Sequence, residues 1–183
     1  MTDHAGVKVK NLSFTIFFLL LLTTSKLVDA AAEFNFSGTL VEEPCLLDPE
    51  DSAIEIDYGT VISKLLYSHQ RTAGKPFTLH LLECDLSLGE SVSVTFIGTE
   101  DSEQPGLIAL DALSTARGVA IGIETLDNKL IPVNQATQAQ KLSSGSNELN
   151  FSIFVSAAHE AVKNKGIISG SVYSHAIFRL YYD

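Results

Sequence analysis

The last fourteen residues of the chain, Gly170–Asp183, alternate between apolar and polar side chains. A repeat of two residues predicts a β-strand with one face toward a core. The odd positions are mostly polar or amphipathic, and Ile177 breaks the rule. This strand runs to the final residue of the sequence, and an apolar strand edge with nothing to cover it invites another strand. The even positions are mostly apolar: Val172, Ala176, Phe178, Leu180 and Tyr182.

Residues 1–30 have the features of a secretory signal peptide. Lys8 and Lys10 give a basic start, and the apolar stretch Leu12–Leu22 follows them. That stretch is too short to span a membrane, which takes about 20 apolar residues. Small residues around Ala30 fit a cleavage site, and we expect cleavage after Ala30 to within about two residues. The mature chain is therefore not expected to insert into a membrane.

Residues 31–41 alternate as strongly as the C-terminal residues do. Polar side chains take the odd positions from Glu33 to Thr39, which predicts a second strand at the opposite end of the mature chain. It is either the first strand of an ordinary sandwich or a segment donated to a neighbouring molecule, and composition does not separate the two. The other face carries Ala32, Phe34, Phe36, Gly38 and Leu40.

The charge of the mature chain excludes two classes of partner. Removing 1–30 takes away three of the 12 basic and two of the 22 acidic residues, which leaves a net charge of −11 on 153 residues. An acidic chain lacks the Lys and Arg that bind the phosphates of nucleic acids. The same balance disfavours an anionic membrane surface. Residues 42–183 are long enough to form one domain with its own core.

Two cysteines remain after export, Cys45 and Cys84. In an oxidising compartment such a pair most often forms one disulfide. Closing a loop of about 40 residues stabilises the fold by about 4 kcal/mol in the chain-entropy model. His80 lies near Cys84, but a zinc site needs three or four ligands at a typical spacing, and the other histidines do not repeat this grouping. We therefore expect no metal and no cofactor.

Between its two ends the sequence contains short alternating apolar segments separated by polar loops. Seven or eight short strands without a clear helix predict an all-β sandwich. Residues 107–116 are expected to form a helical turn at most, and 98–106, 134–147 and 159–166 are expected to be loops. Leu126–Lys129 has the composition of a hairpin turn. The expected strands contain residues 54–58, 77–81, 92–96, 119–123, 130–133 and 149–155.

The sequence contains no catalytic motif that would identify an enzyme. It has no Gly-x-Ser-x-Gly elbow and no phosphate-binding glycine loop. Glu42–Glu43 and Glu50–Asp51 are acidic pairs of the kind that glycosidases use, but they lie among proline, aspartate and serine. We expect a solvated loop there, and we expect that the protein is not an enzyme.

Taken together, these segments resemble the chaperone–usher fimbrial subunits of the type 1 pilin family. The resemblance covers essentially the whole mature chain, and no single motif is specific. The two cysteines, the glycine fourteenth from the end and the penultimate tyrosine are distinctive in combination. The segments that carry the resemblance are Phe36-Ser-Gly38, Cys45, Ile56-Asp-Tyr-Gly59, Phe77–Cys84, Val92–Gly98, Gly118–Ile123, Gly170 and Tyr182.

The resemblance implies an incomplete immunoglobulin-like sandwich that lacks its last strand. In the family a periplasmic pilus chaperone fills the gap first. The N-terminal extension of a neighbouring fimbrial subunit then replaces the chaperone at the outer-membrane usher, by donor-strand complementation. The protein would thus be exported through the periplasm to the cell-surface fimbrium and contribute to cell adhesion.

The resemblance also implies roles for individual residues. Residues 31–41 would be the donor strand, with Phe34, Phe36 and Leu40 as inserted side chains and Gly38 at a close approach. The Asp183 carboxylate would dock on a basic cleft of the chaperone. The acceptor groove and chaperone-binding strand would contain Gly170, Val172, Ala176, Phe178, Leu180, Tyr182 and Asp183.

The length of the chain favours one type of subunit. Only five residues precede Phe36 after cleavage at Ala30, which is short for a rod pilin, and 153 residues leave no room for the extra domain of a tip adhesin. We expect a minor or adaptor subunit, with a rod-forming subunit as the second choice. The alternative from another class is a self-contained secreted β-sandwich that binds a carbohydrate or a peptide.

Overall fold

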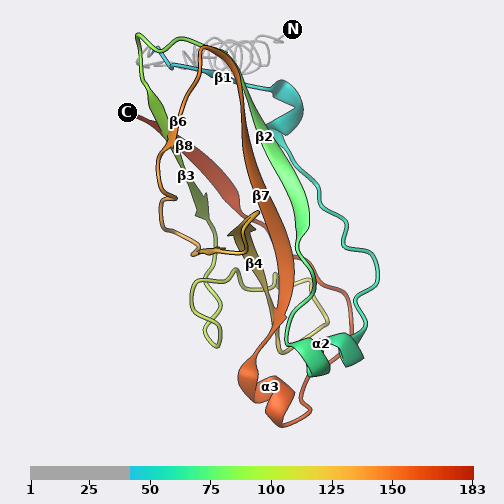
Figure 1. Ribbon diagram of the computed structural model, residues 1–183. Coiled ribbons are helices and arrows are strands. Elements are labelled where there is room, and N and C mark those ends of the chain that lie inside the picture. The colour runs from blue at the N-terminus through green and yellow to red at the C-terminus, as the bar shows by residue number, and fades with distance from the viewer. Residues whose placement is uncertain (1–41) are drawn as a thin grey trace, which may run out of the picture. The chain divides into compact units, whose positions relative to one another are not determined.

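The computed structural model describes residues 42–183, which form two antiparallel sheets around one core (Figure 1). The five-stranded sheet has the order β1-β2-β7-β4-β5, and the three-stranded sheet has the order β6-β3-β8. The strands are β1 (Leu46–Leu47), β2 (Lys75–Cys84), β3 (Ser91–Ile97), β4 (Val119–Thr125), β5 (Leu130–Ile131), β6 (Gln140–Lys141), β7 (Gly145–Ala157) and β8 (Ile177–Tyr182).

The core forms where the alternating apolar faces of the two sheets meet. Alternation places Leu79 and Leu81 of β2 inside, and both are fully buried. From the opposite sheet, Phe96 of β3 contacts Phe151 of β7 edge to face, with 5.2 Å between ring centroids. The strands predicted around 77–81, 92–96, 119–123 and 149–155 are confirmed.

The predicted hairpin between β4 and β5 is also present. Thr125 and Lys129 are joined by a main-chain hydrogen bond, and Asn128 takes the left-handed conformation with φ of 61°. Asparagine tolerates that conformation better than most residues, because its short polar side chain bonds to the local backbone. The turn residues thus determine where β4 ends.

The strand predicted at residues 54–58 is wrong. Residues 53–61 form no strand, and within the described chain they make no main-chain hydrogen bond to another segment. Gly59 takes the left-handed conformation, with φ of 63°. Side chains hold them instead: the Tyr58 hydroxyl donates to the Ile153 carbonyl at 2.9 Å, and Lys75 donates to the Asp57 carbonyl. Alternation predicts a face, but a strand also needs a partner for its backbone.

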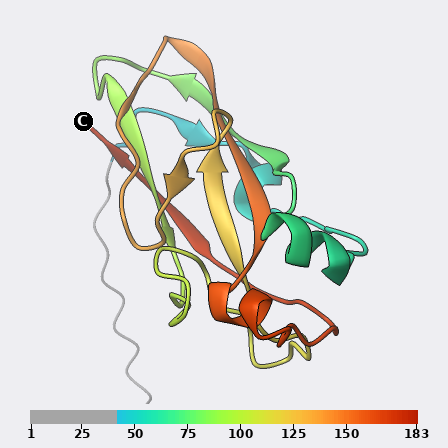
Figure 2. The ribbon, with the colours of Figure 1, turned by 60° about the horizontal axis from the view of Figure 1, so that its bottom comes forward.

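Two short helices were not expected from the sequence. Helix α2 (Ser63–His69) ends at Gln70, which takes the left-handed conformation and donates its N–H to the Leu66 carbonyl at 2.8 Å. Helix α3 (His159–Lys163) lies where a polar loop was predicted. A 3₁₀ turn (η1, Pro49–Ser52) follows β1, and residues 107–116 contain no helix. Both α-helices lie at the same end of the sheets (Figure 2).

Candidate functional site: the open edge of β8

The last strand of the chain has a hydrogen-bonded neighbour on only one side. β8 pairs with β3 in an antiparallel register that runs from Val92↔Tyr182 to Ile97↔Ile177. Within residues 42–183 no strand lies on its other side, so β8 is an edge of the three-stranded sheet. We call this side the open edge of β8.

The register determines which backbone groups face the open edge. Asp183 and Ser91 exchange both of their main-chain hydrogen bonds, at 3.0 and 2.9 Å. In an antiparallel ladder such pairs alternate with pairs that make no mutual hydrogen bond. The N–H and C=O groups of Tyr182, Leu180 and Phe178 therefore point away from β3. These groups are available to a further strand.

The same three residues also turn their side chains toward the core. Phe178, Leu180 and Tyr182 are half-buried and pack against the main hydrophobic cluster. The alternate residues lie on the outer face, where Ile177 is 67% exposed and Tyr181 is 44% exposed. A strand bound at the open edge would thus meet free backbone groups and a partly covered apolar surface together.

Aromatic side chains lie beneath this edge of the sandwich. Phe178 is directly opposite Phe96 on β3. The Phe96 ring lies 6.1 Å from that of Phe77, a half-buried residue of β2 in the other sheet. Because Phe77 and Phe178 are only partly covered, the core is incompletely closed on this side.

The residues before β8 form no strand, so the prediction of a strand over all of 170–183 is wrong in its first half. They run beside residues 111–117 instead, and Ser171 accepts a main-chain hydrogen bond from Thr115 at 3.0 Å. Gly170 fits closely there: a Cβ would lie 2.3 Å from Thr115 Oγ1 and 2.6 Å from the Ala116 nitrogen. Val172 and Ala176 are exposed.

At the other end of β8 the chain finishes in a defined contact. The Asp183 main-chain oxygen accepts hydrogen bonds from the N–H groups of Glu90 and Ser91, at 2.7 and 2.9 Å. In the preceding residue, the Tyr182 hydroxyl oxygen is buried and has no hydrogen-bond partner among the described residues. Burial, together with the negative charge of Glu43, raises the pKa of Tyr182 above 10.0.

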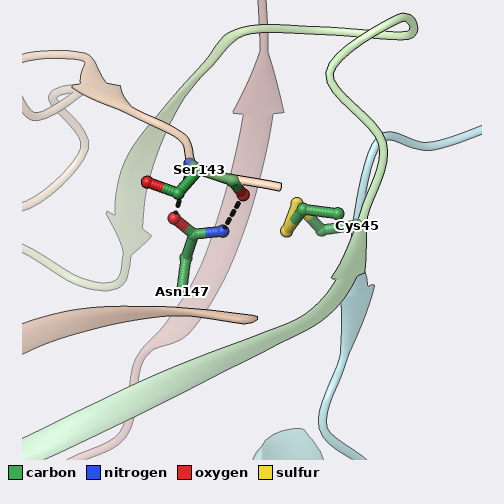
Figure 3. The surroundings of a disulfide bond; sticks show 4 residues. Cys45, Ser143 and Asn147 are labelled. Atoms are coloured by element: carbon green, nitrogen blue, oxygen red, sulfur yellow. Dashed lines mark hydrogen bonds between the residues drawn. A yellow bond between two sulfur atoms is a disulfide. The ribbon is translucent and has the colours of Figure 1, made fainter. Parts of the chain in front are cut away.

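The disulfide expected from the sequence joins Cys45, just before β1, to Cys84 at the end of β2. Figure 3 shows that the loop between β6 and β7 passes beside it. Asn147 holds that loop: its side chain accepts from the Ser143 N–H at 2.8 Å and donates to the Ser143 carbonyl at 2.7 Å. This end of the sandwich is therefore fastened both covalently and by hydrogen bonds.

Sequence patterns did not predict polar side chains whose hydrogen-bond partners lie far away along the chain. Asp51, expected in a solvated loop, is buried and accepts hydrogen bonds from the His80 backbone at 2.5 Å and from its ring at 2.9 Å. No local pattern could reveal a pair 29 positions apart. The predicted donor residues Ala32, Phe34, Phe36, Gly38 and Leu40, together with the signal peptide, lie outside the described residues.

Comparison with known proteins decides the family. The model of the fimbrial protein family matches residues 34–183. The chain belongs to this family. It is 36% identical over 141 residues to the fimbrial-like protein YfcP of Escherichia coli K12, which covers 76% of this chain and 79% of that protein. The fimbrial adapter PapK of Escherichia coli is 27% identical, with 83% and 88% covered.

Solved structures agree on the fold. The P pilus rod subunit PapA superposes with a TM-score of 0.67 at 18% identity and covers 77% of this chain and 100% of that chain. A subunit of a chaperone–usher pilus gives 0.66 at 18% identity, with 86% and 99% covered. The fold is thus the incomplete immunoglobulin-like sandwich of pilus subunits.

Membership of this family makes the protein a structural subunit of surface fimbriae and not an enzyme. Neighbouring fimbrial subunits are accordingly its partners. No helix of residues 42–183 has the length and hydrophobicity to cross a membrane. Within the same residues, His, Cys, Asp and Glu form no group of three that could hold a metal ion.

Proposed function

We propose that this chain is a minor or adaptor subunit of a chaperone–usher fimbria and that it polymerises by donor-strand exchange. Residues 1–30 direct export and are removed, and residues 31–41 become the strand that the chain donates to a neighbour. A periplasmic chaperone covers β8 until the outer-membrane usher exchanges it for that donor. The assembled fimbria contributes to cell adhesion.

One observation carries this proposal: within residues 42–183, Phe178, Leu180 and Tyr182 have both unpaired backbone groups and half-buried side chains. Their backbone groups face the open edge of β8 and their side chains close only part of the core. An added strand satisfies both needs at once, because its main chain bonds to the edge and its alternate side chains pack inward. The alternation of Phe34, Phe36 and Leu40 suits that task.

The direction of the chain favours a donor from another molecule. Asp85 donates its N–H to the Pro44 carbonyl at 2.7 Å, and Gly89 packs between Pro44 and the Asp183 main-chain oxygen. Residues 31–41 therefore join the domain at the end of the sandwich where β8 finishes. If residues 31–41 bound the open edge of β8 in their own subunit, they would run parallel to β8. A neighbour's segment can run antiparallel, as does every pair of strands in the described chain, and antiparallel pairing is the slightly more stable.

The same contacts support a role for the C-terminus in chaperone binding. Two backbone N–H groups hold the Asp183 oxygen at the end of β8, which fixes the position of the terminal negative charge. We infer that a basic cleft of the chaperone binds this charge while a chaperone strand covers Phe178, Leu180 and Tyr182. Charge-assisted hydrogen bonds of this kind are stronger than neutral ones.

A synthetic peptide copying residues 31–41 tests the proposal. The mature chain alone should aggregate or unfold at low denaturant, and the peptide should raise its unfolding midpoint. Replacing Phe34, Phe36 and Leu40 of the peptide by aspartate should abolish the rise. Replacing Asn35, Ser37 and Thr39 by aspartate is the matched control and should keep most of it. A mature chain that melts cooperatively as a monomer and ignores the peptide would be a self-contained sandwich, against the proposal.

The position in the fibre needs a separate measurement. The short extension before Phe36 favours a minor or adaptor subunit, and the similarity to the adapter PapK agrees with this choice. An adaptor should form only short homopolymers after the chaperone is removed. Long regular rods from this chain alone would instead identify a rod-forming subunit.

A further inference from the structure

A second surface next to the open edge carries unusually exposed apolar side chains. Leu113 is 81% exposed, more than any other large hydrophobic residue that the structure describes. Contiguous apolar surface that is left in water commonly marks an interaction site. We call residues 111–117 together with 168–177 the Leu113 surface. Its other exposed apolar members are Ile168 (56%), Val172 (38%), Tyr173 (56%) and Ile177 (67%).

Hydrogen bonds hold the two segments of this surface together. Asp111 donates its N–H to the Tyr173 carbonyl at 2.8 Å, and Arg117 donates to the Ile168 carbonyl at 3.0 Å. The Ser114 side chain, which is buried, both donates to the Tyr173 carbonyl at 2.9 Å and accepts from its N–H at 2.8 Å. The exposed side chains therefore stand on a fixed scaffold, so binding there costs little ordering entropy.

The Leu113 surface adjoins the open edge of β8, because Ile177 is both the last residue of this surface and the first residue of β8. If the donor runs antiparallel to β8, its last residues reach this end of the edge. Alternate packing can then set Phe34, Phe36, Gly38 and Leu40 of the donor opposite Tyr182, Leu180, Phe178 and Ala176 in turn. In this register Glu42 of the donor chain falls opposite Ser174. The body of the donating subunit must therefore begin at the Leu113 surface.

The part of the donating subunit that arrives there is also partly apolar. Residues 42–44 adjoin the turn between β2 and β3, because Asp85 donates to the Pro44 carbonyl and Gly89 packs on the Pro44 ring. On that turn Leu86 is 37% exposed and Leu88 is 47% exposed. Apolar surfaces thus meet on both sides of the contact, and each loses exposure to water.

We propose that the Leu113 surface is a docking site for the β2–β3 turn of the fimbrial subunit whose extension occupies the open edge of β8. This inference rests on the proposed function, since the donated strand determines where the second subunit lies. The contact is heterologous: one end of a subunit meets the opposite end of the next. It adds affinity for an intact subunit that an isolated donor peptide lacks.

Competition between peptide and intact subunit tests the docking site. The mature chain is assembled in increasing concentrations of the 31–41 peptide, and the concentration that halves assembly is measured. Leu113→Glu should lower this concentration at least tenfold, because the intact donor loses its second contact. The unfolding midpoint of the peptide-bound variant should equal that of the wild type, since Leu113 is exposed and the peptide does not reach it.

Leu126→Glu is the matched control. Leu126 is 60% exposed and lies in the β4–β5 turn, outside the Leu113 surface. The peptide concentration that halves assembly of Leu126→Glu should equal that of the wild type. Equal concentrations for Leu113→Glu and Leu126→Glu would overturn the docking site while leaving donor pairing in place. If the peptide neither stabilises nor competes even in the wild type, donor-strand pairing fails, and this inference fails with it.

Discussion

Arg71 and Glu124 form a two-pronged ion pair across strand β7. The two guanidinium nitrogens of Arg71 donate to the two carboxylate oxygens of Glu124 at 2.9 and 2.7 Å. The Arg71 guanidinium also lies over the ring of Phe154 on β7, 3.7 Å from the ring centre. Glu124 is buried, and Ser152 donates to it as well, at 3.3 Å. The pair fastens the segment after α2 to the sheet, away from the open edge of β8.

Arg71→Met should destabilise the domain, because it leaves the Glu124 carboxylate buried without its cation. We expect a loss of about 2–3 kcal/mol, below the roughly 3–5 kcal/mol of a fully buried pair, since water screens a partly exposed arginine. Denaturant unfolding midpoints of wild type and variant, refolded under identical conditions, measure it. Arg71→Met/Glu124→Leu should recover most of the loss. Lys129→Met, which removes the exposed pair with Asp127, is the control and should leave the midpoint unchanged.

Gly170→Ala should loosen the segment that leads into β8. The new Cβ would sit 2.3 Å from Thr115 Oγ1 and 2.6 Å from the Ala116 nitrogen, and the second of these atoms belongs to the backbone. Overpacking of this kind costs about 1–3 kcal/mol. Gly166→Ala is the matched control, because its nearest neighbour would lie at 3.8 Å. Equal unfolding midpoints for the two variants would contradict the close fit of Gly170.

The alternation of Phe178, Leu180 and Tyr182 predicted the face of β8 correctly because a strand repeats every two residues. The same rule failed for Gly170–Ala176, where the backbone bonds to residues 111–117 through irregular contacts. It failed at residues 54–58 for a related reason: alternation specifies a face but no partner.

The polar interior could not be predicted from the sequence. Arg71 and Glu124 lie 53 positions apart, so neither residue has a local signature of the pair. Helix α2 has one buried side chain, Leu66, and thus lacks the apolar stripe that identifies longer helices. The disulfide was predictable because only two cysteines exist and the signal peptide indicates an oxidising compartment.

Loss of the Cys45–Cys84 disulfide should destabilise the end of the sandwich from which residues 31–41 depart. The two cysteines are 39 positions apart, and removing the cross-link should cost about 2–4 kcal/mol, mostly through the freedom gained by the unfolded chain. Cys45→Ala/Cys84→Ala and the reduced wild type should show similar unfolding midpoints. A reductant should not change the midpoint of the double variant. If reduction left the wild type unchanged, the disulfide would be irrelevant to stability.

Tyr182 should make the stability of the domain fall at alkaline pH. Burial and Glu43 raise the pKa of its phenol above 10.0, so the folded protein holds this proton more tightly than the unfolded chain. That contribution to the free energy of unfolding is complete below pH 10 and is lost as the pH rises through the folded-state pKa. Unfolding midpoints measured from pH 8 to pH 11.5 should show the decline.

Tyr182→Phe should remove the alkaline decline that belongs to this residue. At neutral pH the variant should be as stable as the wild type or more stable by up to about 1 kcal/mol, because a buried hydroxyl without a partner only costs desolvation. Tyr181→Phe is the control, since its ring lies on the outer face of the same strand. A bound donor buries the edge further and should move the wild-type decline to still higher pH. If the stability of Tyr182→Phe fell at alkaline pH as much as that of the wild type, another group would be responsible for the loss.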